Sequence, residues 1–246
     1  MVVLQVAAGN ETDAVKILDH LRKKFDAIKS TYYIVNTKKN DSFFDLDPVH
    51  HGGDAFIFES IDKLIFKIGP KSFFQTNPSQ AEKLYAHTIK MAKLSGQERV
   101  YDLYTGTGTI ALMAAINGAK QVIGIENVAA AIEDAKENAI DNQISNATFY
   151  AGDTRDLFNQ AMFAKEGRPD VLITDPPRAG MHPDVIRTIL DAEPDRIIYV
   201  SCNPASQARD VALLSLKYKV EAIQPVDMFP HTHHVENIAA LTKINS

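Results

Sequence analysis

Cys202 is the only cysteine, and so the only thiol, in this chain of 246 residues. It lies in the stretch YVSCNPASQARD, after the short apolar run RIIYVS and before Asn203 and Pro204. A lone cysteine is most often a small buried hydrophobic residue. This one follows a predicted interior strand and precedes a predicted helix start, a position that faces a ligand crevice and can lower the pKa of a thiol. Cys202 is therefore a candidate nucleophile.

A glycine-rich turn forms a second candidate site. Gly106 and Gly108 follow the run RVYDLY, and their missing side chains let backbone amides approach a ligand. Residues 106–111 satisfy the dinucleotide pattern G-x-G-x-x-G/A, and Glu126 stands 20 residues after Gly106, where a carboxylate binds ribose hydroxyls. This pattern fits a nicotinamide cofactor and S-adenosylmethionine equally well.

Carboxylates follow other predicted strands. Asp175 opens an Asp-Pro-Pro-Arg loop that ends at Arg178, and its two prolines make the loop rigid and extended. Asp153 is either a solvated loop carboxylate or a contact to the base of a cofactor. Glu236 is either a salt-bridge partner or a general base that faces Cys202.

Three histidines within four residues occur in the stretch MFPHTHHVEN. Their spacing is not typical of zinc sites, and no second ligand cluster accompanies them. We therefore expect solvated or hydrogen-bonding loop histidines here, and no metal site.

Regular alternation of strands and helices must position these residues. Asn77 and Pro78 predict a helix start, with an apolar stripe at Ala81, Leu84, Tyr85, Ile89 and Ala92. Short apolar strands separated by helices predict an α/β fold with a mostly parallel sheet covered on both faces. In such sheets ligands bind beyond the carboxyl ends of the strands. The expected strands are 99–104, 121–126, 147–152, 170–175, 196–201, 218–226 and 236–244, with helices at 109–117, 128–140, 183–190 and 205–216.

The first part of the chain has mixed patterns. Strands are expected at residues 2–8, 31–37 and within 54–68, and a helix is expected at residues 12–25. The segment His50-His51-Gly52-Gly53 is predicted to be a loop.

Composition indicates an ordinary soluble globular protein, with 45% hydrophobic and 23% charged residues. A single cysteine fits a reducing cytoplasm, and no apolar run approaches the ~18 residues that span a bilayer. The net charge of -5 gives no overall attraction to nucleic acid, so an RNA substrate needs a local basic face or a further domain.

Six motifs in one order give the chain a specific resemblance. They are SFFQTNPSQAEKLY, YDLYTGTGTIAL, GIENVAAAIEDAKENA, TDPPRAG, YVSCNPASQARD and DMFPHTHHVE. From about residue 30 onward the chain resembles the RNA uracil-5-methyltransferase family, which makes 5-methyluridine in ribosomal and transfer RNA with S-adenosylmethionine. The resemblance implies a Rossmann-like class I methyltransferase domain with a seven-stranded sheet over residues 69–246. Residues 1–68 are then part of a small central α+β subdomain.

The resemblance also implies residue roles. Cys202 of SCNP is the nucleophile that adds to carbon 6 of a uracil, and Glu236 of HVE is the base that removes the carbon 5 proton. Arg178 and Phe73 help to hold a flipped-out or single-stranded uridine. The implied cofactor contacts are Gln75, Tyr104, Thr109, Glu126, Asp153 and Asp175.

The FFQTN form of the first motif is similar to the ribosomal branch, so the expected substrate is 23S rRNA, with a tRNA uridine as the alternative. Family members usually carry an RNA-binding barrel domain, and many have four cysteines for an iron–sulfur cluster. We expect neither in this chain, and Thr105 stands where the glycine loop often has a cysteine.

Other functions explain fewer motifs. A nicotinamide-dependent oxidoreductase shares the glycine turn and Glu126, but it does not explain Cys202, Asp175 and Glu236 together. An amino-group methyltransferase uses an Asp-Pro-Pro loop without needing a cysteine. An inactive RNA-binding fragment would have no use for both Cys202 and Glu236.

Overall fold

The computed structural model describes residues 1–40 and 45–244, which form two compact units. The N-terminal unit comprises residues 1–59 and 66–74, and the C-terminal unit comprises residues 60–65 and 75–246. The assignment of residues 69–246 to a catalytic domain remains a prediction.

The N-terminal unit contains a three-stranded sheet in the order β1-β2-β3. Strand β1 (Val2–Val6) pairs in parallel with β2 (Ser30–Val35), and the helix α1 (Glu11–Lys24) connects the two strands. Strand β3 (Val49–Gly53) pairs antiparallel with β2. Two further short strands, β4 (Ile57–Ile61) and β5 (Leu64–Ile68), pair with each other.

Strand β3 corrects the prediction of a loop at residues 50–53. Its sequence, VHHGG, lacks the apolar alternation that marks a strand, but pairing with β2 supplies its backbone partners. The His50 ring lies 4.9 Å from the Tyr32 ring, and Tyr32 pairs with His50 in the register. An added Cβ at Gly53 would meet the Lys29 carbonyl oxygen at 2.1 Å, so glycine permits this close approach.

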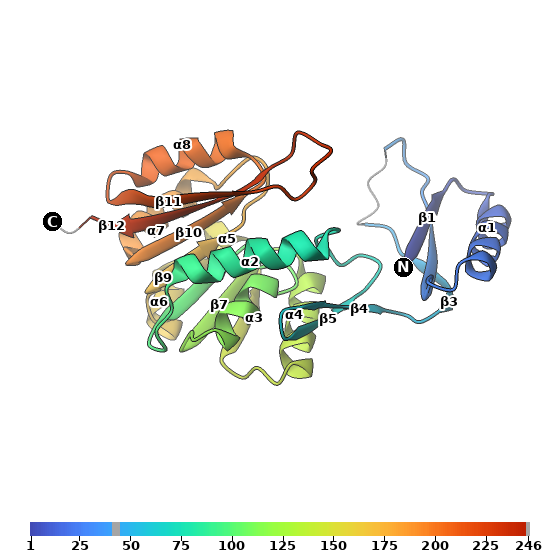
Figure 1. Cartoon of the computed structure of the whole chain (residues 1–246), viewed down its shortest axis with the longest axis horizontal. Helices are drawn as coiled ribbons and strands as arrows, with labels where there is room; N and C mark the ends of the chain where they lie inside the picture. The colour runs from blue at the N-terminus through green and yellow to red at the C-terminus, as the bar shows by residue number, and fades with distance from the viewer. Residues whose placement is uncertain (41–44, 245–246) are drawn as a thin grey trace. The chain divides into compact units, whose positions relative to one another are not determined.

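The C-terminal unit is built on a seven-stranded sheet in the order β11-β12-β10-β9-β6-β7-β8 (Figure 1). Six strands run in the same direction, and β12 is antiparallel to both of its neighbours. This confirms the predicted seven-stranded, mostly parallel sheet. The strands are β6 (Arg99–Leu103), β7 (Gln121–Glu126), β8 (Ala147–Ala151), β9 (Val171–Thr174), β10 (Arg196–Ser201), β11 (Tyr218–Val226) and β12 (Glu236–Lys243).

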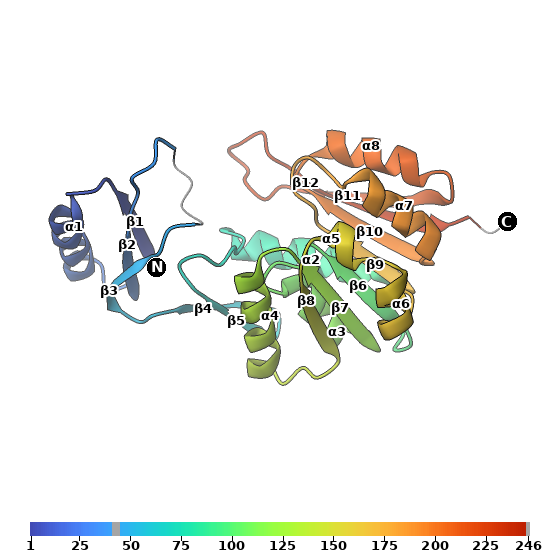
Figure 2. The same cartoon turned by 180° about the vertical axis from the view of Figure 1, so that it is seen from behind.

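Helices cover both faces of this sheet, as predicted (Figures 1 and 2). Helices α2 and α3 lie on one face, while α6, α7 and α8 lie on the other. The bounds are α2 (Pro78–Ala92), α3 (Thr109–Ile116), α4 (Ala129–Asp141), α5 (Thr154–Leu157), α6 (Gln160–Glu166), α7 (Pro183–Ala192) and α8 (Pro204–Leu214). The Asn77 side chain caps α2 as predicted, and all five residues of its apolar stripe are buried.

Alternation along the strands separates two layers of side chains. Tyr101 and Leu103 point into the large core formed with α6, α7 and α8. Asp102, between them, points to the opposite face, where α2 and α3 pack. In the described part of the chain, none of the helices combines the length and the apolar character needed to cross a membrane.

Candidate active site

The predicted nucleophile and base lie at facing ends of neighbouring strands. Cys202 directly follows β10, and Glu236 begins β12, which runs antiparallel to β10. Ser201 pairs with Asn237 in the register, so the next positions, Cys202 and Glu236, stand opposite each other on one face of the sheet. The fold therefore brings these two residues together although 33 residues separate them in the sequence.

The surroundings of Cys202 do not lower the pKa of its thiol, contrary to the expectation from its position before a helix. Burial and the neighbouring carboxylates of Glu236 and Asp175 raise this pKa, while the Arg178 guanidinium lowers it. Burial is the largest of these causes, and the two carboxylates lie at the same strand ends as the thiol. Arg178 is thus the cation that favours a thiolate at this site.

Three carboxyl groups lie on the same face, of which Asp102 is buried and Asp175 and Glu236 are half-buried. Burial raises the pKa of Glu236, which Arg178 opposes, and burial raises the pKa of Asp175 well above its ordinary value. Burial also raises the pKa of Asp102 to about 7. A base with a raised pKa is better matched to proton removal near neutral pH than an ordinary carboxylate is.

Sequence reasoning missed Asp102. Its Oδ2 accepts a hydrogen bond from the Thr105 hydroxyl (2.5 Å), while its Oδ1 is buried without a hydrogen-bond partner among the described residues. The sequence feature that could have identified Asp102 is a single acidic residue inside the apolar run VYDLY. An acceptor of this kind next to a glycine turn suits a cationic ligand group.

Tyr85 and Gln75 lie beside these carboxyl groups. Burial, followed by the charges of Asp175, Glu236 and Asp102, raises the pKa of Tyr85, and a hydrogen bond with Gln75 opposes this rise. Gln75 is therefore positioned against α2, near the candidate nucleophile and base. Phe73 belongs to the N-terminal unit, where its side chain is 71% exposed, and its substrate role remains a prediction.

The glycine turn and Glu126 are joined by hydrogen bonds. The Glu126 carboxylate accepts from the backbone N–H of Gly106 (3.2 Å) and of Val128 (3.0 Å). Gly106 has φ +56°, and a Cβ added to it would meet no heavy atom within 4 Å, which leaves room for a ligand. Glu126 thus lies beside the glycine turn, and its role in binding ribose hydroxyls remains a prediction.

Residues around the turn are held in constrained conformations. Tyr104 has φ +64°, unusual for a residue with a side chain, and burial raises its pKa to about 12. Gly108 has φ +83° and directly precedes Thr109, the first residue of α3. Unfavourable backbone conformations of this kind concentrate at functional sites.

Asp153 follows β8 and caps the short helix α5 through the backbone N–H of Arg155 (2.9 Å). The Arg155 guanidinium also donates to both carboxylate oxygens, and these bonds lower the Asp153 pKa to about 2. A ligand that binds Asp153 must therefore share it with Arg155 or displace the guanidinium.

The loop between β11 and β12 contributes a contact to Arg178. The Arg178 Nη2 donates to Nδ1 of His234 (3.2 Å), so this nitrogen carries no proton in that bond. The His233 and His234 rings lie 4.2 Å apart. Within residues 1–40 and 45–244, no group of three or more histidine, cysteine or acidic side chains is arranged to hold a metal ion.

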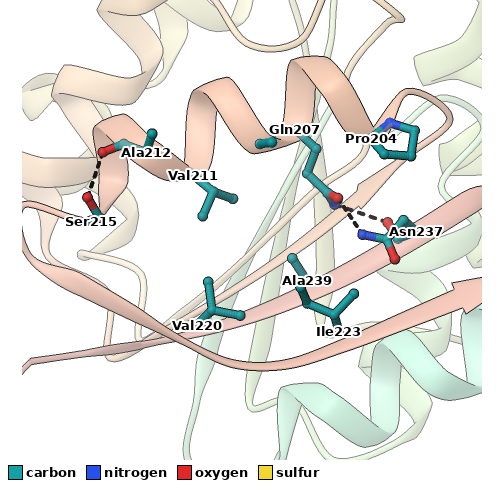
Figure 3. Close-up of a pocket in the computed structure, with 10 residues that line it drawn as sticks. Pro204, Gln207, Val211, Ala212, Ser215, Val220, Ile223, Asn237 and Ala239 are labelled. Carbon is teal, nitrogen blue, oxygen red and sulfur yellow. Dashed lines mark hydrogen bonds between the residues drawn. The ribbon is translucent and has the colours of Figure 1, made fainter.

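An apolar groove of about 420 Å³ lies between α8 and strands β11 and β12 (Figure 3). Gln207 and Asn237 form hydrogen bonds at one end of it, and Val211 faces Val220 further along. Asn237 and Glu236 are neighbours along β12, so their side chains point to opposite faces of the sheet. The groove, which Asn237 lines, therefore lies on the opposite face from Cys202 and Glu236. The groove is therefore separate from the candidate active site.

Comparisons with known proteins identify the family. Residues 60–244 match the family described as tRNA (Uracil-5-)-methyltransferase. The chain is 55% identical over 242 residues to an uncharacterized RNA methyltransferase of Bacteroides thetaiotaomicron, covering 98% of this chain and 53% of that protein. It is 52% identical over 229 residues to an uncharacterized RNA methyltransferase of Porphyromonas gingivalis, covering 92% of this chain and 49% of that protein.

A solved structure agrees with these matches. The tRNA (uracil-54, C5)-methyltransferase of Pyrococcus abyssi, in complex with S-adenosyl-L-homocysteine, superposes with a TM-score of 0.77 at 36% identity. The match covers 90% of this chain and 53% of that one, so the chain spans about half the length of these relatives. Together with the sheet and the six motifs, the matches show that the chain belongs to the tRNA (uracil-5-)-methyltransferase family.

Proposed function

We propose that this protein transfers a methyl group from S-adenosylmethionine to carbon 5 of a uridine in RNA, through a covalent bond between Cys202 and carbon 6. The observation that carries the proposal is that Cys202 and Glu236 adjoin the last paired residues of β10 and β12, Ser201 and Asn237, with Arg178 acting on both. The P. abyssi relative is named as a uracil C5 methyltransferase, and it was crystallised with S-adenosyl-L-homocysteine.

The residues at the glycine turn fit S-adenosylmethionine, which supplies the methyl group when bound. Glu126 offers carboxylate oxygens for ribose hydroxyls, and the open side of Gly106 allows close approach. The unpartnered Oδ1 of Asp102 suits the cationic amino group of the methionyl part. Further proposed contacts are Gln75, Tyr104, Gly108, Thr109, Asp153 and Asp175.

The chemistry requires one nucleophile and one base. The Cys202 thiolate bonds to carbon 6, and the carbon 5–carbon 6 electron pair becomes an enolate whose charge reaches carbon 5. Carbon 5 would then form a bond to the methyl group as the bond between that group and the sulfonium sulfur breaks, with S-adenosylhomocysteine as the leaving group. Glu236 removes the carbon 5 proton, the electron pair restores the double bond, and the sulfur leaves carbon 6 as a thiolate. Arg178 stabilises the negative charge on the sulfur before the bond to carbon 6 forms and after it breaks.

The two proposed residues act at different steps, so their variants must fail differently. Cys202→Ala cannot form the carbon 6 bond and should give no covalent complex with RNA. Glu236→Gln keeps nearly the same size and should stall after methyl transfer, with the RNA still attached to Cys202. The complex is measured as a slow band on a denaturing gel that requires S-adenosylmethionine. Normal turnover by Glu236→Gln would contradict the role of Glu236 as the base, and a covalent band from Cys202→Ala would contradict the role of Cys202 as the nucleophile.

The substrate RNA is proposed to be 23S rRNA because of the FFQTN motif. A tRNA uridine is the alternative, favoured by the name of the P. abyssi relative. Methylation of ribosomal and transfer RNA pools, each followed by mass mapping of 5-methyluridine, distinguishes the two. Label in the tRNA pool alone would reject the ribosomal proposal.

A further inference from the structure

Helix α8 binds the backbone of the loop at residues 175–181, which carries Asp175 and Arg178. The bonds run from Asn203 Nδ2 to the Arg178 carbonyl (3.0 Å), from Arg209 Nη2 to the Ala179 carbonyl (2.8 Å) and from the Met181 N–H to Asp210 Oδ2 (2.8 Å). We call Asn203, Arg209 and Asp210 the α8 clamp. It fixes three backbone groups within four residues of the loop.

Asp210 is the buried centre of the α8 clamp, with none of its surface exposed. Its carboxylate accepts from the Tyr199 hydroxyl (2.7 Å) and from Arg209 Nε and Nη2 (2.9 and 2.7 Å), in addition to the Met181 N–H. A buried charge is tolerated only when it is paired and fully hydrogen-bonded. These partners hold the carboxylate in one position, so the loop that it binds is held as well.

Gly180 shows how closely the loop approaches α8. A Cβ added to this residue, which has φ +82°, would meet Asp210 Oδ2 at 2.5 Å and Arg209 Nη2 at 2.6 Å. Only glycine fits there without a shift of the α8 clamp. The loop and the helix therefore behave as one packed body.

The same helix also positions the candidate nucleophile. Cys202 immediately precedes Asn203, whose side chain caps α8 through the Ala205 N–H (3.1 Å). One rigid element thus fixes both Cys202 and the loop that carries Arg178. The charged groups that act on the thiol are Glu236, Arg178 and Asp175, and Arg178 alone among these three is a cation.

We propose that Arg209 and Asp210 are positioning residues, which hold the 175–181 loop so that the Arg178 guanidinium stays beside Cys202 and Glu236. Neither residue is among the groups that act on the thiol, and both act through the loop. The proposal extends the proposed function, because it assigns these residues to the environment of the nucleophile. Its test uses the thiol alone and needs neither RNA nor S-adenosylmethionine.

The single cysteine makes this test specific, because Cys202 is the only thiol that iodoacetamide can alkylate. The rate of alkylation of the whole chain is measured against pH for the unaltered protein and for the variants Arg178→Ala and Arg209→Gln. Loss of the nearby cation should slow alkylation at about pH 8 by roughly three- to tenfold in both variants. The double variant should be no slower than Arg178→Ala, because Arg209 acts through Arg178.

Arg187→Gln is the matched control. It makes the same change of charge on an exposed arginine of α7 that pairs with Asp184, and it should leave alkylation unchanged. Asn203→Ser keeps an uncharged capping oxygen but removes the longer amide group that donates to the Arg178 carbonyl, so it tests the α8 clamp if Arg209→Gln does not fold.

The outcomes separate positioning from general stability. Reduced thermal stability with an unaltered alkylation profile in Arg209→Gln and Asn203→Ser would overturn the proposal. Additive effects in the double variant would overturn it as well, because they require a direct action of Arg209. If Cys202→Ala still methylates RNA, the proposed function fails while the alkylation result keeps its meaning.

Discussion

Asp102 should make the protein less stable as pH rises towards neutrality. Burial raises its pKa to about 7 from an ordinary value of 3.8. Between these two values the folded protein retains a proton that the unfolded chain has released. The free energy of unfolding therefore falls as pH rises through this window. At about 1.4 kcal/mol for each pH unit, the effect is roughly 2–4 kcal/mol.

Asp102→Asn removes this dependence because an amide does not titrate. Its oxygen can still accept from the Thr105 hydroxyl, and its NH₂ replaces the unpartnered Oδ1. Urea unfolding followed by circular dichroism, at about pH 5 and about pH 8, gives the change in unfolding free energy for each protein. The change should be smaller in the variant by roughly 2–4 kcal/mol. Asp175 and Glu236 shift in the same direction, so some dependence remains.

Glu193→Gln is the control with the opposite sign. Hydrogen bonds from Lys217 and Lys243 lower the Glu193 pKa to about 2, so its contribution is present above its ordinary value of 4.5 and is lost only in acid. This variant should leave the difference between pH 5 and pH 8 unchanged. Equal pH dependence in Asp102→Asn and the unaltered protein would refute the reasoning.

Three other predictions concern ligands and the turn. Glu126→Ala should weaken S-adenosylhomocysteine binding by roughly 1–3 kcal/mol in calorimetric titration, and unchanged affinity would contradict its placement. Gly108→Ala should destabilise the fold more than Gly106→Ala, since its Cβ would lie 3.0 Å from that of Ala135 whereas Gly106 has open space. Equal unfolding temperatures would argue against this. RNA binding by the chain should be weak and should fall steeply with salt in filter binding, whereas tight salt-insensitive binding would oppose it.

The sequence predicted the sheet because each strand of the C-terminal unit is a short apolar run between helices. The strands β7, β10 and β11 lie at the predicted residues. Strands β6, β8 and β12 end one residue earlier than predicted, and β9 is one residue shorter at each end. Strand ends also predicted that Cys202 and Asp175 meet at one edge. Helices α5 and α6 were missed, because four and seven residues are too few to show helical periodicity.

Structural features that depend on residues distant in the sequence but close in the fold could not be predicted from the sequence. The strand at residues 49–53 forms because β2 pairs with it, and its own residues carry no strand pattern. The raised thiol pKa depends on burial and then on Glu236, which follows Cys202 by 34 residues and comes near it through the antiparallel pairing of β10 and β12. The α8 clamp likewise connects residues about 30 positions apart.

The interior position of β12 has a consequence for how the protein is made. This strand is the last of the described strands to be synthesised, yet it lies between β10 and β11. On the ribosome, β11 therefore cannot pair with the sheet until β12 has emerged. Until then β10 exposes an unpaired edge, which promotes aggregation. A nascent chain interrupted before residue 236 already contains the glycine turn and Cys202, but it lacks Glu236. Because of this topology, the seven-stranded sheet and the pair Cys202 and Glu236 are both completed late in translation, when β12 is synthesised.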